Sequence, residues 1–79
     1  MNYTYKTKGT CSKEIHFSMD GNIVTDVEFI GGCHGNTQGI SRLVKGMTAE
    51  EVIERLEGIR CGRKPTSCPD QLAQALKNR

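Results

Sequence analysis

Four cysteines are the residues of this sequence whose side chains offer the most chemistry. They are Cys11, Cys33, Cys61 and Cys68, and they lie 22, 28 and 7 positions apart in a chain of 79 residues. A thiolate binds soft metal ions, acts as a nucleophile and exchanges with disulfides. No pair has the C-x-x-C spacing that is typical of zinc fingers and zinc ribbons, so a shared site would have to be built by the fold.

Three of these cysteines are expected at the ends of secondary-structure elements. Cys11 opens a predicted hairpin, and Cys68 lies in the first turn of a predicted helix. Cys33 lies between them in the glycine-rich joint, which we define as residues 31–36. Because the end of a sheet and the N-terminus of a helix can meet in space, the three sulfur atoms are predicted to cluster at one end of the domain. A helix N-terminus also favours the thiolate form of a cysteine.

These residues support three hypotheses for function. In the first, Cys11, Cys33 and Cys68 bind zinc or an iron–sulfur cluster. The fourth ligand would then be Cys61 or His34. In the second hypothesis, Cys61 and Cys68 exchange electrons as a thiol–disulfide carrier, which requires their Cα atoms to lie less than ~7 Å apart.

The third hypothesis is a module that binds a nucleotide or another anion. Backbone amides that precede a helix form a nest for anions, and the glycine-rich joint precedes a predicted helix. The joint matches neither the P-loop nor the dinucleotide-binding fingerprint. The residues considered for this site are Gly32, Gly35, Asn36, Thr37 and Arg63. No catalytic residues are predicted, because no Ser/His/Asp set or pair of carboxylates has the required placement.

Length and composition indicate a single domain over residues 1–79 with a thin core. Hydrophobic residues make up 35% of the chain and there is no Trp, and small domains of this kind often depend on a metal, disulfides or a partner. The net charge of +2 is too small to indicate nucleic-acid binding. No segment approaches the ~18 apolar residues of a membrane span. The N-terminus lacks the apolar segment of a signal peptide, so we expect a cytoplasmic protein with reduced thiols.

The first part of the chain is predicted to form an antiparallel hairpin. Apolar residues alternate with Glu14, His16 and Ser18, which is the pattern of a half-buried strand. Residues 20–22 have the composition of a tight turn. We expect strands near residues 11–19 and 23–30 and an edge strand within residues 3–7. The residues expected on the buried face are Ile15, Phe17, Met19, Ile23, Val27 and Phe29.

The second part of the chain is predicted to form three helices, near residues 38–46, 49–57 and 68–78. The first has apolar residues at Ile40, Leu43 and Val44. Thr48 and Glu51 have the spacing of a capping box, and Ser67 is the expected N-cap of the last helix, with Asp70 three residues later. The expected fold is therefore α+β: a small antiparallel sheet that three helices cover on one face.

Residues 66–70 read TSCPD, the motif that names the TSCPD domain family. The chain resembles small stand-alone members of that family over nearly its whole length. The segments that carry the resemblance are residues 9–12 (GTCS), 31–36 (GGCHGN), 43–47 (LVKGM) and 66–70. The same domain occurs near the C-terminus of adenosylcobalamin-dependent ribonucleotide reductases. The resemblance implies an accessory domain that acts with a protein partner, for which a ribonucleotide reductase is the candidate, and that is not catalytic alone.

A more distant similarity is to the U-type iron–sulfur scaffold proteins. Those proteins carry one ligand cysteine before a strand, one in a glycine-containing loop after a strand and one at the start of a late helix. Cys11, Cys33 and Cys68 match these three places. The similarity implies the same order of antiparallel strands followed by helices. The aspartate that follows the first cysteine of the scaffold is not matched, because Ser12 and Lys13 stand there, and Cys61 is additional.

Overall fold

The structure is a computed structural model that describes residues 1–9, 12–31, 34–60, 62–63 and 65–79, without the side chains of residues 34–36. The elements within these residues are β1 (Asn2–Lys6), β2 (Ser12–Asp20), β3 (Ile23–Gly31), α1 (His34–Val44), α2 (Ala49–Leu56) and α3 (Cys68–Lys77). The strands form an antiparallel sheet in the order β1-β2-β3. The predicted α+β fold is therefore confirmed, including the edge strand.

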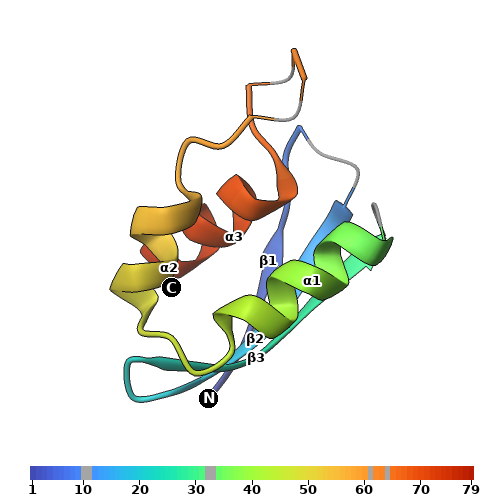
Figure 1. Cartoon of the computed structure of the whole chain (residues 1–79). Helices are drawn as coiled ribbons and strands as arrows, with labels where there is room; N and C mark the ends of the chain where they lie inside the picture. The colour runs from blue at the N-terminus through green and yellow to red at the C-terminus, as the bar shows by residue number, and fades with distance from the viewer. Residues whose placement is uncertain (10–11, 32–33, 61, 64) are drawn as a thin grey trace.

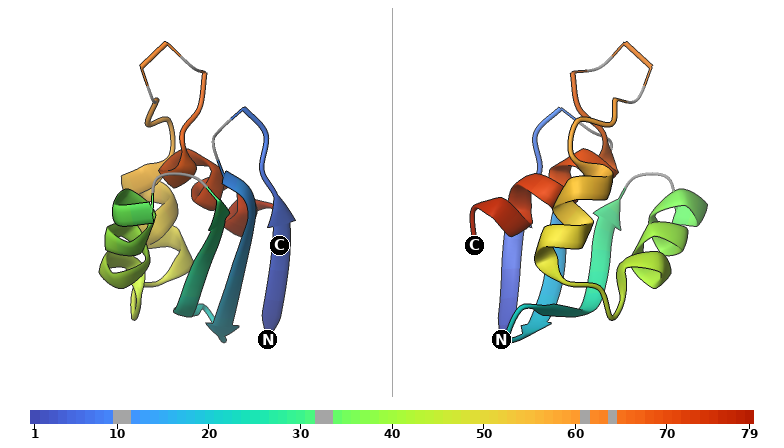
Figure 2. Two further views of the ribbon diagram at one scale, coloured as in Figure 1. Left: turned by 90° about the vertical axis from the view of Figure 1, so that its right-hand side faces the viewer. Right: turned by 60° about the vertical axis from the view of Figure 1, so that its left-hand side comes forward.

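The helices lie on one face of the sheet, as predicted (Figures 1 and 2). α1 packs beside β3, whereas α3 contacts β2 and packs against α2. The opposite face carries the polar residues of β2, where His16 Nε2 lies 2.8 Å from Glu14 Oε1. This division follows from the alternation of β2, which turns successive side chains to opposite faces of a sheet.

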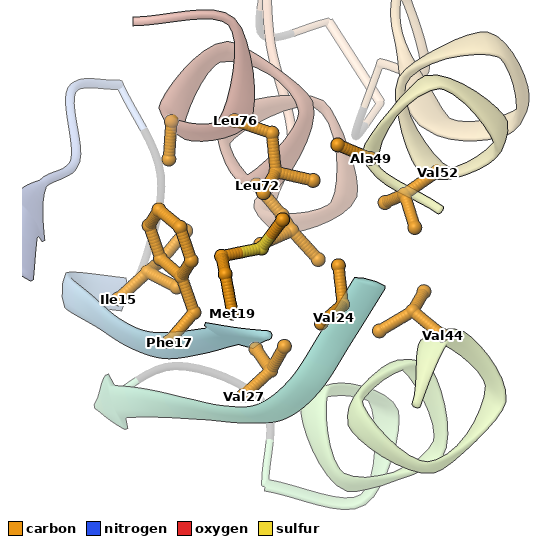
Figure 3. Packing of buried hydrophobic residues seen from close by; sticks show 11 residues of the cluster. Ile15, Phe17, Met19, Val24, Val27, Val44, Ala49, Val52, Leu72 and Leu76 are labelled. Carbon is orange, nitrogen blue, oxygen red and sulfur yellow. The ribbon is translucent and has the colours of Figure 1, made fainter. Parts of the chain in front are cut away.

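The hydrophobic core fills the space between the sheet and the helices (Figure 3). The predicted core residues of β2, which are Ile15, Phe17 and Met19, are each at most 4% exposed. Leu72 and Leu76 of α3 are fully buried, and their spacing of four residues puts them on one face of the helix. Burial of α3 on β2 therefore fixes the position of the helix that begins with Cys68.

One prediction for the buried face of β3 was wrong. Ile23 is exposed, and Val24 takes its place in the core. The pairing changes between Ser18↔Asp26 and Met19↔Val24, so Thr25 is an extra residue on β3. Such a β-bulge reverses the alternation of side chains beyond it. Val27, on the other side of the bulge, is buried as expected.

The apolar pattern of α1 was also partly wrong. The helix begins at His34, four residues before the expected start, and its Leu43 is 77% exposed. The side chains that face the sheet are instead Thr37, Ile40 and Val44, which recur at the three- and four-residue spacing of one helix face. α1 packs mainly against β3, so only this narrow face is covered.

The predicted starts of α2 and α3 are confirmed. The side chain of Thr48 accepts a hydrogen bond from the Glu51 N–H, and the Glu51 carboxylate accepts one from the Thr48 N–H. Ser67 caps α3 by accepting a hydrogen bond from the Asp70 N–H at 3.1 Å. These contacts satisfy amide groups that have no partner within the helix.

Two leucines that lie in different surroundings test this packing. Leu72→Ala is expected to lower the free energy of unfolding by about 2–5 kcal/mol, because it opens a cavity in the core. Leu43→Ala changes a side chain that is 77% exposed and is expected to stay within about 0.5 kcal/mol of the wild type. Urea denaturation followed by circular dichroism measures both. If Leu43→Ala lowered the free energy of unfolding as much as Leu72→Ala, Leu43 would have to be buried, which would contradict the described position of α1.

Candidate functional site

One end of the domain gathers segments that are far apart in the sequence. β2 begins there, β3 ends there, and Ser12 is paired with Gly31 in the sheet. The connection between β1 and β2 and the loop between α2 and α3 reach the same end of the molecule (Figure 1). The side chain of Cys68, the first residue of α3, contacts Ser12, so α3 also begins at this end. We call this region the sheet end.

A second β-bulge shapes the sheet end. Ser12 pairs with Gly31 and Glu14 pairs with Ile30, so Lys13 is an extra residue on β2. Strict alternation would turn Lys13 inward and Ser12 outward. The bulge reverses this: Ser12 is 4% exposed and Lys13 is exposed. The backbone of the bulge is held by Thr7, whose N–H donates to the Lys13 carbonyl at 3.1 Å and whose hydroxyl donates to the Ser12 carbonyl.

The buried Ser12 side chain meets Cys68. Ser12 Oγ lies 2.8 Å from Cys68 Sγ, and either atom can be the donor of this hydrogen bond. Cys68 is a half-buried free cysteine. This contact joins the residue that follows Cys11 in the sequence to the first residue of α3, although the two are 56 positions apart.

The residues around Cys68 fix the start of α3. The Ser67 hydroxyl donates to the Ile59 carbonyl at 2.6 Å while it caps the helix. The Asp70 carboxylate accepts hydrogen bonds from the Gly58 N–H at 2.7 Å and from the Thr66 hydroxyl. The contacts of Ser67 with Ile59 and of Asp70 with Gly58 bind α3 to the segment that follows α2. They hold the two ends of the loop that contains Cys61.

A further chain of hydrogen bonds reaches the connection between β1 and β2. The Gln71 side chain donates to Thr66 Oγ1 at 3.0 Å, and its carbonyl oxygen accepts from the Lys8 N–H at 3.0 Å. Gly9, with φ of +74°, lies so close to Thr66 that a Cβ atom there would be 3.1 Å from Thr66 Cγ2. Thr66 and Gln71 therefore hold the segment before Cys11 against the first turn of α3.

The sequence also matches a known protein family. The sequence model of the TSCPD domain matches residues 2–79. The chain belongs to the TSCPD domain family. No curated protein and no solved structure matches the chain. Among the helices of the described part, none is long and apolar enough to cross a membrane.

The structure gives each residue of the TSCPD motif a physical role. Thr66 and Asp70 form the hydrogen bonds that hold the loop, Ser67 is the N-cap, and Pro69 lies in the first turn of the helix, where its missing N–H costs nothing. The side chain of Cys68 contacts Ser12 at the start of β2. The motif is thus a helix start that presents one cysteine.

Three of the cysteines that we predicted as ligands, Cys11, Cys33 and Cys61, lie outside the described residues. His34 is the first residue of α1, and its side chain is not described. Within the residues that the structure does describe, no group of three or more His, Cys, Asp or Glu side chains could hold a metal ion. The three cysteines and the side chain of His34 are not among those residues, so the ligand set and the Cys61–Cys68 redox pair both stay predictions.

The residues considered for an anion site also stay a prediction. Gly32 lies outside the described residues, whereas Gly35, Asn36 and Thr37 belong to the first turn of α1. Thr37 is 5% exposed and lines a hollow between α1 and β3, which Ser41 and Arg42 of α1 also line. Arg63 is exposed in the loop before α3.

Sequence reasoning missed Ser12 and Gln71 as residues of the sheet end. The signal for Ser12 was available: Lys13 stands at a position that strict alternation would bury with Ile15 and Phe17. A lysine is almost never fully buried without a partner, so the alternation had to break there. The hydrogen bonds of Gln71 join residues 63 positions apart, and no local pattern predicts them.

The electrostatics of the site centre on Asp70, which is 8% exposed. Burial acts to raise the pKa of this carboxyl group. The hydrogen bonds from Thr66, Gly58 and Gln74, together with the charge of Lys77, outweigh burial and hold the pKa below its ordinary value. A lowered pKa in the folded state means that the ionised form of Asp70 stabilises the fold.

Asp70→Asn is expected to lower the free energy of unfolding by about 1–3 kcal/mol at pH 7, because it weakens buried hydrogen bonds. The contribution of Asp70 is fully present above the pKa of the unfolded chain and is lost as the pH falls through the lower pKa of the folded state. The difference between wild type and variant should therefore shrink as the pH falls from neutral through the ordinary range of an aspartate carboxyl group and below it. Urea denaturation across this range measures it. The control is Asp20→Asn at an exposed position of β2, and a similar loss in that variant would contradict the special role of Asp70.

Proposed function

We propose that the protein is a small cysteine-based metal-binding accessory domain, which binds zinc or an iron–sulfur cluster at the sheet end. The ligands in this proposal are Cys11, Cys33 and Cys68. The fourth ligand is Cys61 or His34. The observation that carries the proposal is the 2.8 Å contact between Ser12 Oγ and Cys68 Sγ, because it joins the start of β2 to the start of α3.

Chain connectivity supports a shared site. Ser12, which directly follows Cys11, touches Cys68. Gly31, which precedes Cys33 by two residues, is the sheet partner of Ser12. Consecutive Cα atoms are about 3.8 Å apart, so the described neighbours of all three cysteines belong to one small region of the fold. Because no two of these cysteines have the C-x-x-C spacing, a shared metal site requires the fold to bring them together in this way.

The residues also fit the chemistry of a soft metal site. Cys68 is free, half-buried and the first residue of a helix. Thiolates suit zinc and iron–sulfur centres and do not suit magnesium or calcium. Bound zinc would stabilise the fold by linking the segments that carry its ligands, and a bound cluster would add one-electron transfer. The chain itself supplies the ligands and the hydrogen bonds that orient them.

The proposed partner is a ribonucleotide reductase. Membership of the TSCPD domain family supports this, since the domain also forms the C-terminal part of adenosylcobalamin-dependent reductases. The segment that matches the family, residues 2–79, is the TSCPD domain, and its role in this proposal is accessory. The reductase would carry out the chemistry, and this domain would bind the metal beside it.

Thermal stability tests the metal site. A ligand that binds only the folded protein adds ~2.7 kcal/mol at 100 times its dissociation constant. For a domain of this size, each kcal/mol raises the melting temperature by roughly 4–8 °C. Reduced protein loaded with zinc or iron–sulfur cluster should therefore melt about 10 °C or more above the chelated sample. Cys33→Ser and Cys68→Ser should each abolish this difference, because a hydroxyl is a poor ligand for a soft metal.

Two histidines provide the control for the fourth ligand. If His34 binds the metal, His34→Ala removes most of the shift, whereas Cys61→Ser leaves it. His16→Ala on the polar face of β2 should leave the shift unchanged in either case. Reduced protein that gains no stability from either metal would contradict the proposal. Reversible cycling of Cys61 and Cys68 with glutathione would then favour the thiol–disulfide carrier.

A further inference from the structure

The contact between Ser12 and Cys68 has a feature that packing alone does not explain. Ser12 is 4% exposed, yet it is a polar residue in a strand whose inward positions are otherwise apolar. A buried hydroxyl costs roughly 1–3 kcal/mol unless it is hydrogen-bonded. The bulge at Lys13 brings this hydroxyl inside the fold, where it contacts Cys68 Sγ.

The strength of this hydrogen bond depends on the state of the sulfur. A neutral thiol is a weak donor and a weak acceptor. A thiolate accepts hydrogen bonds that are about twice as strong as those between neutral groups. When Cys68 binds a metal, its sulfur carries no proton, so the direction of the bond is fixed: Ser12 donates and Cys68 accepts.

We propose that Ser12 is a positioning residue of the metal site, whose hydroxyl donates a hydrogen bond to the metal-bound sulfur of Cys68 and orients that sulfur. This inference rests on the proposed function and extends it to a residue that is not a ligand. Partners of this kind fix the geometry of metal ligands and tune the metal, and their loss typically costs 10–100-fold in affinity. β-bulges are common beside functional sites because they re-aim one side chain, which is what the bulge at Lys13 does to Ser12.

Cobalt(II) is the probe for this proposal, because it replaces zinc in thiolate sites and has visible spectra. Ser12→Ala should bind Co²⁺ about 10–100-fold more weakly than the wild type. It should also shift the sulfur-to-cobalt charge-transfer band, since the donor to one thiolate is gone. The main-chain contacts of Ser12 involve its carbonyl and its pairing with Gly31, so they survive the substitution.

Two further variants separate the hydroxyl from the shape of the side chain. Ser12→Thr keeps a hydroxyl and should restore the wild-type band and most of the affinity. Ser12→Val has the same shape as Ser12→Thr without the hydroxyl, and it should behave like Ser12→Ala. The matched control is Ser18→Ala on the same strand, which removes a 2.7 Å hydrogen bond to Asn2 on the polar face. It should leave both the affinity and the band unchanged.

The outcomes distinguish this inference from the proposed function. If the wild type binds neither Co²⁺ nor a reconstituted iron–sulfur cluster, both are overturned. If the wild type binds Co²⁺ and Ser12→Ala binds it with the same affinity and the same band, only the role of Ser12 is overturned. If Ser12→Ala fails to fold in chelator, the Thr and Val variants decide the question, and equal behaviour of that pair would also overturn it.

Discussion

The arrangement of the sheet end depends on the hydrogen bonds that the buried carboxylate of Asp70 accepts. The carboxylate accepts them from Gly58 and Thr66, which lie at the two ends of the loop between α2 and α3. Gln71 extends this set to Lys8 in the connection between β1 and β2. A loop of this length would otherwise be free to move away from the first turn of α3. The carboxylate therefore fixes the surroundings of Cys68 as well as the first turn of α3, to which Asp70 belongs.

The two β-bulges act at opposite ends of the hairpin and have different consequences. The bulge at Thr25 turns Val24 into the core and leaves Ile23 exposed, so it changes which side chain of β3 packs there. The bulge at Lys13 exchanges a lysine for a serine on the inner side of β2, and the outcome is a hydroxyl beside a thiol. Both changes arise from one extra residue, because the side-chain period of a strand is two residues.

The sequence predicted those features that depend on neighbouring residues. The strands, the turn between them, the capping box at Thr48 and the N-cap at Ser67 follow from local patterns, and the structure has all of them. The predictions for Ile23 and Leu43 were wrong because a bulge and a narrow helix contact are set by the packing of the whole domain. For the site, Cys68 at the start of α3 was predicted from the motif. Its contact with Ser12 was not predicted, because it depends on pairing between distant strands and helices.

The central claim is that the cysteines at the sheet end bind a metal. Elemental analysis of protein that has been purified without oxygen and under reducing conditions tests this claim most directly. We expect stoichiometric zinc, or iron together with acid-labile sulfide, in the wild type, and loss of that metal in Cys68→Ser. Wild-type protein that is folded, fully reduced and free of zinc and iron, and that takes up neither when they are supplied, would contradict the account.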